Sequence, residues 1–388
     1  MPEHNEAITN IGLTNWRDNK QIFGIKEEDR FRHIYAIGKT GVGKSTLLLN
    51  MAISDIEKGN GLCVIDPHGD ITEDLLNHIP EHRIKDVIYF NPQDLHFPIG
   101  FNPLSNIHLD SFHLVVSGLT STFKKIWLES WGPRLEYILR FSLLTLLEYP
   151  DATLLDIQPL LTNIHFRNLV LNHVQNKQVI AFWKHEFEKY PPALKAEAIA
   201  PVLNKAGVFI ASMPLRNIIG QAENSLDFDR IVNDKKILIA NLSKGQIGED
   251  ATTILGSIIV TSIQLAVMRR SALSEEERVP FFLYVDEVHS YVSLSFLDIL
   301  AEARKYKLSL FLTHQYIEQI DERMRAAIFG NVGTLISFRV GSTDAAYLEK
   351  EFAPVFNRSD LLNLPRYSIY LKLMIDGTTS KPFSAEAL

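Results

Sequence analysis

The feature that most constrains this chain is the run GKTGVGKS, from Gly38 to Ser45. A short apolar run, His33 to Ile37, precedes it, and Thr46 to Ile56 follows with apolar residues at helical spacing. Glycines at such a junction let the backbone curl so that successive N–H groups point inward, and the helix N-terminus adds its positive dipole end. The context therefore predicts a phosphate-binding loop where a strand turns into a helix.

The side chains of this loop have distinct expected roles. Lys44 should reach the β- and γ-phosphates of a nucleoside triphosphate, and Ser45 should place its hydroxyl on Mg²⁺. A glycine-rich turn without chemical meaning is the alternative, and it leaves the lysine and the hydroxyl unexplained. The predicted nucleotide-binding residues are Gly38, Lys39, Thr40, Gly41, Val42, Gly43, Lys44, Ser45 and Thr46.

The rest of the chain extends this strand and helix into a sheet. From Phe31 onward, apolar runs alternate with helical segments, which predicts an α/β fold with a mostly parallel central sheet covered on both faces. Most of these runs are continuously apolar, as buried central strands should be. The predicted strands are Gln21–Ile25, His33–Gly38, Leu62–Asp66, Val87–Asn91, Ile237–Leu242, Phe281–Asp286, Ser309–Thr313, Thr334–Val340 and Ser368–Ile375.

One long segment interrupts this alternation. Between about residues 104 and 230 the strand signals vanish and helical periodicity takes over, with several prolines dividing the segment into short helices. We expect an all-helical insertion at 104–230. The nucleotide-binding domain should then consist of residues 31–103 and 231–388, preceded by an N-terminal extension at 1–30.

The composition sets limits on partners and compartment. A hydrophobic content of 46% and a charged content of 22% are those of a globular protein. The net charge of −7 gives no bulk signal for nucleic-acid binding, although basic groups inside a pore would be hidden in that sum. The single cysteine, Cys63, excludes an internal disulfide and fits a reducing cytosol. The N-terminus lacks the apolar core of a signal peptide, so we expect a cytoplasmic protein.

One pair of tryptophans and one pair of lysines in the helical segment could be interpreted as nucleic-acid contacts. Trp127 and Trp131 lie four residues apart, and Lys124-Lys125 precede them. Core packing is the preferred interpretation of the tryptophans, and a solvated helix face that of the lysines.

One apolar segment has a marginal length for a membrane span. Ala251 to Met268 carries no charged side chain and ends at Arg269-Arg270. A helix packed inside a protein explains its polar stripe better than lipid does, so we expect no integral membrane segment. The stripe recurs at helical spacing and consists of Thr253, Ser257, Thr261 and Gln264.

A second strand carries the acids expected for hydrolysis. PFFLYVDE, from Pro280 to Glu287, is an apolar run that ends in two adjacent carboxylates. Strand ends of an open parallel sheet meet at the crevice where ligands bind. We expect Asp286 to hold Mg²⁺ together with Ser45, and Glu287 to polarise the attacking water. The alternative is an ordinary cap for a helix that begins near Ser293.

Other polar residues near strand ends have two interpretations each. Arg304 lies near the end of the same expected helix, where a basic residue also suits the helix dipole. Gln315 ends the run SLFLTHQ and is either a strand-end polar residue or a sensor of the γ-phosphate. His68 is interpreted as a turn residue, because no second histidine stands at metal-ligand spacing. Asp66 ends its own strand and could reach the nucleotide crevice.

The motifs together resemble those of the HerA–FtsK superfamily, and most closely the cytoplasmic ATPase of conjugative, type IV secretion coupling proteins (TraG/TraD-like). The resemblance covers about residues 30 to 385. It implies a RecA-like ATPase that uses ATP and Mg²⁺, assembles as a hexamer and pumps DNA through a central pore. The segments that carry it are GKTGVGKSTLL, IDPHGD, FNPL, LYVDEVHS, LAEARKYKLSLFLTHQY, GNVGTLISFRVGSTDA and GTTSKPFS.

The resemblance also implies roles for single residues. Arg304 falls where these motors place an arginine that reaches into the neighbouring subunit's site, and Arg339 is a second candidate for that role. Gln315 falls at the sensor position. The Walker A pair and the Walker B acids correspond to Lys44, Ser45, Asp286 and Glu287.

The chain departs from the family pattern in ways that leave the function open. Coupling proteins usually begin with transmembrane helices, and none is visible here. We therefore expect a soluble member that works with a separate relaxase, nuclease or secretion channel. A nucleotide-gated docking ATPase that regulates such a partner without processive DNA transport is the alternative. A small-molecule kinase is disfavoured, because Glu287 beside Asp286 suits water activation.

Overall fold

The structure is a computed structural model that describes residues 8–15, 17, 19–292 and 296–388. The chain divides into two compact units. The first contains residues 1–90, 228–243 and 266–388, and the second contains residues 91–227 and 244–265. The start of the helix expected near Ser293 lies outside the described residues.

The first unit contains an eleven-stranded sheet among the described residues, in the order β2-β1-β13-β10-β9-β3-β8-β7-β4-β6-β5. The seven strands from β9 to β5 are mutually parallel, which confirms the predicted mostly parallel α/β fold. The strands are β1 Ile8–Thr14, β2 Ile22–Lys26, β3 Ile34–Ile37, β4 Gly61–Asp66, β5 Val87–Phe90, β6 Ile237–Asn241, β7 Phe281–Val285, β8 Leu308–His314, β9 Thr334–Ser337, β10 Ser368–Lys372 and β13 Phe383–Ala387.

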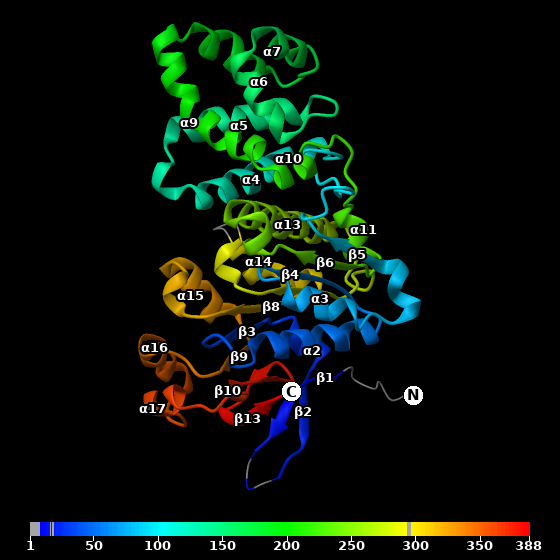
Figure 1. Cartoon of the computed structure of the whole chain (residues 1–388), viewed down its shortest axis with the longest axis vertical. Helices are drawn as coiled ribbons and strands as arrows, with labels where there is room; N and C mark the ends of the chain where they lie inside the picture. Colours follow the sequence, from blue (N-terminus) through cyan, green and yellow to red (C-terminus); the bar gives the residue numbers. More distant parts are fainter. Residues whose placement is uncertain (1–7, 16, 18, 293–295) are drawn as a thin grey trace. The chain divides into compact units, whose positions relative to one another are not determined.

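The four remaining strands pair antiparallel and lie together at one end of this sheet (Figure 1). The first of them, β1, was missed by the sequence analysis, which expected one strand in the N-terminal extension. The last, β13, was missed as well. A separate small hairpin joins β11, Met374–Ile375, to β12, Thr378–Thr379.

Helices of the first unit pack on this sheet. The first long helix, α2, buries Leu47, Leu48 and Met51 in a cluster with strand residues such as Ile34 and Val64. Each fully buried aliphatic side chain of this kind contributes about 1.5–3 kcal/mol. The helices are α1 Glu27–Arg30, α2 Lys44–Glu57, α3 Asp70–Leu76, α11 Phe228–Asn233, α14 Phe296–Glu302, α15 Glu322–Asn331, α16 Ser342–Phe352 and α17 Arg358–Leu362.

A buried ion pair ties α2 to the sheet. The Arg30 guanidinium binds both oxygens of the Asp55 carboxylate, at 2.6 and 2.8 Å, and also contacts the Tyr284 hydroxyl at 2.8 Å. Both charged side chains are almost fully buried. Burial opposes the charge on Arg30, but the Asp55 carboxylate and Tyr284 outweigh it and raise the pKa of the guanidinium.

In the second unit the described residues form helices and no strands. Its aromatic core includes Trp183, which is fully buried and donates through Nε1 to the Thr145 hydroxyl at 2.8 Å. Trp127 packs against Phe123 and Phe209, in agreement with a packing role. The helices are α4 Phe112–Ile126, α5 Pro133–Leu147, α6 Ile157–Thr162, α7 Ile164–Leu171, α8 Lys177–Ala181, α9 Pro192–Ala211, α10 Met213–Ile219, α12 Lys244–Ile247 and the first part of α13, Glu249–Arg269.

One helical segment, Glu249 to Ala272, is long and apolar enough to cross a membrane by length and composition. Its most apolar window is 78% buried, as is typical of a core helix. The bent pair α9 and α10 would qualify only if two helices at 95° were counted as one span. Within the segment, the predicted polar stripe is mostly buried, and the Thr261 hydroxyl lies 3.3 Å from that of Thr122. The described residues therefore show no clear membrane span.

Candidate active site

The glycine-rich loop joins β3 to α2, as predicted. Gly41 and Gly43 have φ angles of 74° and 120°, a region that residues with a Cβ rarely adopt. A Cβ on Gly38 would lie 2.6 Å from the Cβ of Phe338, and one on Gly43 would lie 2.7 Å from the ring of Tyr367. Gly41 and Gly43 are therefore required for their backbone conformation, and Gly38 and Gly43 because a Cβ has no room.

Lys44 begins α2 and folds back over the loop. Its ammonium donates to the carbonyl oxygens of Gly38, at 2.6 Å, and Lys39, at 3.0 Å. Burial lowers the pKa of Lys44, and the nearby carboxylates of Glu287 and Asp286 oppose that shift. Ser45 and Thr46 are exposed in the first turn of the helix, where a ligand can reach them.

The order of the strands brings the acids next to this loop. Strand β8 lies between β3 and β7, with His314 opposite Ile37 and Leu312 opposite Val285. The residues that end β7 and β8 therefore share one edge of the sheet with the loop. The sequence analysis placed these residues at strand ends, and the sheet order brings them together.

Asp286, directly after β7, is almost fully buried and accepts a hydrogen bond from the hydroxyl of Thr313. Burial raises the pKa of the Asp286 carboxyl, the Thr313 hydrogen bond opposes that shift, and the neighbouring Glu287 carboxylate adds to it. A bound divalent cation would favour the ionised carboxylate, so the chemistry of this group suits a metal ligand.

Glu287 is buried, and one of its two carboxylate oxygens accepts a hydrogen bond. Its backbone adopts a left-handed conformation, with φ of 51°, which sharply turns the chain after Asp286. One carboxylate oxygen, Oε1, accepts a hydrogen bond from Nε2 of Gln315 at 2.8 Å. The other, Oε2, lies 3.4 Å from Nδ1 of His289.

Gln315 connects the acid to the loop. The same amide that donates to Glu287 accepts a hydrogen bond from the Thr40 hydroxyl through Oε1, at 3.1 Å. A continuous chain of hydrogen bonds thus runs from Thr40 in the loop through Gln315 to Glu287. Any phosphate that engages Thr40 or Gln315 would act on the position of the carboxylate.

Asp66 makes hydrogen bonds with the backbone at the start of α3. Its carboxylate accepts three backbone N–H bonds, from His68 at 2.8 Å, Ile71 at 2.9 Å and Thr72 at 3.2 Å. These bonds cap the start of α3, so the side chain is committed to the fold. Burial raises the pKa of Asp66, while the backbone hydrogen bonds, the one from His68 foremost, oppose that shift. No group of three or more histidine, cysteine or acidic side chains that could hold a metal ion occurs among the described residues.

The two candidate arginines differ in their relation to the loop. Arg304 is exposed in the short helical turn Ala303–Tyr306 after α14, and no hydrogen bond or ion pair of the described residues joins its side chain to the loop or the acids. Arg339 is also exposed, but its carbonyl oxygen accepts the backbone N–H of Lys39 at 2.9 Å. The structure therefore fixes Arg339, and not Arg304, beside the loop of its own chain.

The sequence analysis missed several members of the site. Thr313 stands two residues before Gln315 at the end of β8. Residues two apart in a strand share a face, so this spacing could have identified Thr313. The Thr40–Gln315 bond had no local signal, because the two residues lie 275 positions apart. His289 follows the left-handed turn at Glu287, and its Nδ1 lies 3.4 Å from Oε2 of that carboxylate.

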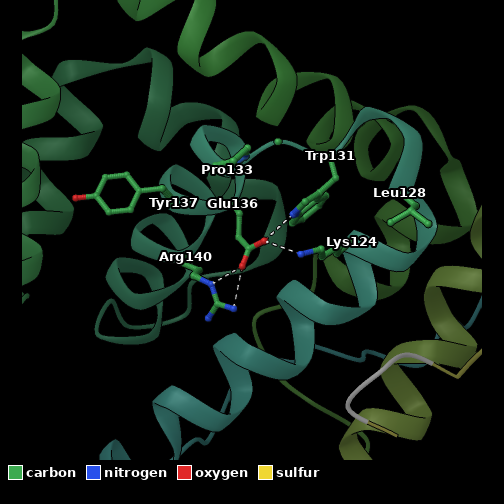
Figure 2. A pocket seen from close by; sticks show the side chains of 8 residues that line it. Lys124, Leu128, Trp131, Pro133, Glu136, Tyr137 and Arg140 are labelled. Carbon is green, nitrogen blue, oxygen red and sulfur yellow. Dashed lines mark hydrogen bonds and ion pairs between the residues drawn. The ribbon is translucent and has the colours of Figure 1, made fainter. Parts of the chain in front are cut away.

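The helical unit contains a separate surface pocket of about 480 Å³ (Figure 2). At its centre the Glu136 carboxylate accepts hydrogen bonds from Trp131 Nε1 at 2.8 Å, Lys124 at 3.4 Å and Arg140 at 3.2 Å. The Trp131 hydrogen bond is the main cause of a lowered pKa at Glu136. Because Glu136 already pairs both cations, this pocket offers no unpaired positive charge to a phosphate backbone.

Comparison with known proteins gives structural matches only. No family model and no curated protein sequence matches the chain. The bacterial conjugative coupling protein TrwB in its unbound form is 17% identical, with a TM-score of 0.68 over 97% of this chain and 88% of that one.

TrwB in complex with ADP and Mg²⁺ is 16% identical, with a TM-score of 0.70 over 97% and 89% of the two chains. VirB4 of Thermoanaerobacter pseudethanolicus is 14% identical, with a TM-score of 0.65 over 99% and 97%. These likenesses agree with the resemblance found in the motifs. The chain has the RecA-type P-loop fold that conjugative coupling proteins share with VirB4.

Proposed function

We propose that this protein is an ATPase of the type IV secretion coupling kind. The observation that carries the proposal is the hydrogen-bonded chain from Thr40 through Gln315 to Glu287, beside the buried Asp286. It joins the phosphate loop, an acid suited to water activation and an amide at the next strand end in one site. Solved structures of the same fold, two TrwB complexes, contain ADP with Mg²⁺ or an ATP analogue, which supports ATP and Mg²⁺ as the ligands here.

Each residue then has a chemical task. The loop N–H groups and the Lys44 ammonium bind the β- and γ-phosphates, for which Lys44 leaves the carbonyls of Gly38 and Lys39. Ser45 and Asp286 provide the hard oxygen ligands that Mg²⁺ prefers. When bound, the ion neutralises charge on the phosphate oxygens.

Glu287 orients the attacking water and accepts its proton, a role worth about 10²- to 10⁴-fold in rate. Gln315 contacts both Glu287 and the loop, so its amide is placed to respond to the γ-phosphate. If the Nε2–H of Gln315 donated to a γ-phosphate oxygen instead of to Glu287, the carboxylate would be free to engage water. Hydrolysis would thus begin only after the triphosphate is seated.

The proposal extends to a homo-hexameric DNA translocase in the cytoplasm. A transition-state arginine supplied by a neighbouring subunit makes hydrolysis depend on assembly. Arg304 suits this role because it is exposed, and no hydrogen bond or ion pair of the described residues joins it to its own loop. Arg339, whose backbone bonds to Lys39, is the second candidate. A relaxase, nuclease or secretion channel is the proposed partner.

The test is ATP hydrolysis with and without single- and double-stranded DNA, followed by displacement of a protein roadblock from DNA. We expect DNA to stimulate hydrolysis and the roadblock to be removed only when ATP is present. Hydrolysis without stimulation by either DNA would contradict the motor. Stimulation without displacement would favour the nucleotide-gated docking ATPase, because only a translocase pushes.

A further inference from the structure

We propose that the ring of Tyr367 is the stacking surface for the base of the bound nucleotide. This inference rests on the proposed function and adds a binding determinant that the phosphate loop does not supply. The loop recognises phosphates alone, so a base contact must come from elsewhere in the fold.

Tyr367 lies at the same edge of the sheet as the loop. It directly precedes β10, which runs antiparallel to β9 with Tyr370 opposite Ser337. The start of β10 therefore lies beside the end of β9, and β9 in turn pairs in parallel with β3. This order places Tyr367 beside the loop without any contribution from the second unit.

The backbone of Tyr367 is bound on both sides. Its N–H donates to the carbonyl oxygen of Val42 in the loop, at 3.0 Å, and its own carbonyl accepts the N–H of Ala387, at 2.8 Å. The ring lies against Gly43, where a Cβ would come within 2.7 Å of Cδ1. The last glycine of the phosphate loop and the aromatic ring are therefore in direct contact.

The conformation of Tyr367 is unusual for its residue type. Its φ of 65° lies in the left-handed region, which costs about 1–3 kcal/mol for a residue other than glycine. Arg366 packs over the ring, with the guanidinium carbon 4.7 Å from the ring centroid, yet the residue stays 40% exposed. A large aromatic side chain is thus held rigid and open to solvent beside the loop.

A nucleobase is the ligand that this arrangement suits. The nucleoside is joined to the phosphates that the loop would hold, and the exposed ring lies against that loop. Stacking of a base on an aromatic side chain contributes about 1–3 kcal/mol and depends little on which base is present, because every base has a π-face. Rigid placement of the ring keeps the ordering cost of that contact small.

The test compares a ligand that has a base with one that lacks it. Binding of ATP and of inorganic tripolyphosphate, both with Mg²⁺, is measured by calorimetry on the full chain. Tyr367→Asn removes the ring and tolerates the left-handed backbone, and Tyr367→Phe keeps the ring face. Tyr367→Gly, which also suits the positive φ, is a second ring-free variant should the first fail to fold.

We expect Tyr367→Asn to raise the Kd for ATP about 5- to 150-fold, the range that 1–3 kcal/mol implies. The Kd for tripolyphosphate should stay within about twofold, and Tyr367→Phe should bind both ligands like the wild type. Equal weakening of both ligands would show that the ring only supports the loop. No weakening of ATP would show that the ring does not contact the base. A wild-type protein that binds neither ligand would instead refute the proposed function.

Discussion

The amide of Gln315 donates a hydrogen bond to the carboxylate of Glu287, with 2.8 Å between Nε2 and Oε1. The two residues end neighbouring strands and lie 28 positions apart in the chain. Because Gln315 also bonds to Thr40, the position of the carboxylate is tied to the state of the phosphate loop.

Gln315→Ala should uncouple the carboxylate from the loop. We expect kcat for ATP hydrolysis to fall about 10- to 100-fold, because small misplacements of a catalytic group have effects of that size. The Kd for ATP should change little, since the amide is not one of the loop N–H groups. Steady-state kinetics and calorimetry measure the two values. Gln158→Ala, at an exposed residue of α6, is the matched control and should leave both unchanged. A lowered affinity with unchanged kcat would contradict the assignment.

Glu287→Gln should separate binding from turnover. The amide keeps the size of the side chain but cannot accept a proton from water, so kcat should fall about 10²- to 10⁴-fold while ATP still binds. Phosphate release and calorimetry give the two readouts. The same change at Glu318, which is exposed, should have no effect. Wild-type turnover in Glu287→Gln would remove this residue as the water activator.

Arg304→Ala tests whether the site is shared between subunits. The variant alone should be inactive, because an arginine supplied in trans contributes about 10³- to 10⁵-fold. Mixed with a Lys44→Ala variant, it should regain part of the activity, because one intact site can form where the subunits meet. ATPase assays of mixtures at several ratios measure this rescue. A confirmed ring without rescue would exclude Arg304 and direct the same experiment to Arg339.

Asp55→Ala should destabilise the fold far more than loss of a surface ion pair. It leaves the Arg30 guanidinium buried without its carboxylate, which costs about 3–5 kcal/mol. The control is Glu386→Ala, which breaks the exposed Lys20–Glu386 pair and should cost at most about 1 kcal/mol. Urea unfolding gives both free energies. Similar values for the two variants would contradict the structural role of the buried pair.

His33 should make the fold sensitive to acid. Its ring is buried, with Nε2 3.2 Å from the Leu300 carbonyl and Nδ1 3.3 Å from the N–H of Leu310, so the neutral ring fits both neighbours. Burial lowers the pKa of His33 to about 4. The unfolded state, with a pKa of about 6.5, therefore binds the proton first as the pH falls.

The contribution of His33 to the free energy of unfolding is fully present above about pH 6.5. It falls by about 3 kcal/mol in total as the pH falls toward 4. His33→Asn, which tolerates the positive φ at this position, should flatten the dependence between those pH values. Urea unfolding at pH 7 and pH 5 measures the difference from wild type. An identical pH dependence in the variant would contradict the assignment.

Local patterns predicted the part of the fold that local forces determine. The loop from Gly38 to Ser45 joins its strand and helix as expected. The predicted apolar strands of the parallel sheet also form. The strands β1 and β13 were missed because they alternate weakly and because they pair with each other from opposite ends of the chain. Their pairing register contains no signal that a short window could detect.

For the candidate site, the sequence indicates single residues but not how they are arranged. Asp286 and Glu287 could be placed at a strand end, yet only the strand order shows that β8 separates them from the loop. The capping role of Asp66 depends on how α3 begins. The position of the Tyr367 ring depends on the start of β10 lying beside the loop. Both are consequences of contacts between distant segments.

The position of the Lys44 ammonium has a consequence for nucleotide exchange. In the structure its protons already point to the carbonyl oxygens of Gly38 and Lys39. When a phosphate binds, the ammonium therefore exchanges these carbonyl oxygens for phosphate oxygens. Lys44 then contributes to the free energy of binding only the difference between the two sets of hydrogen bonds. In the proposed cycle, the ammonium would return to these two carbonyl oxygens when the product leaves. Such an exchange of acceptors would favour rapid reloading of the loop over tight retention of the nucleotide.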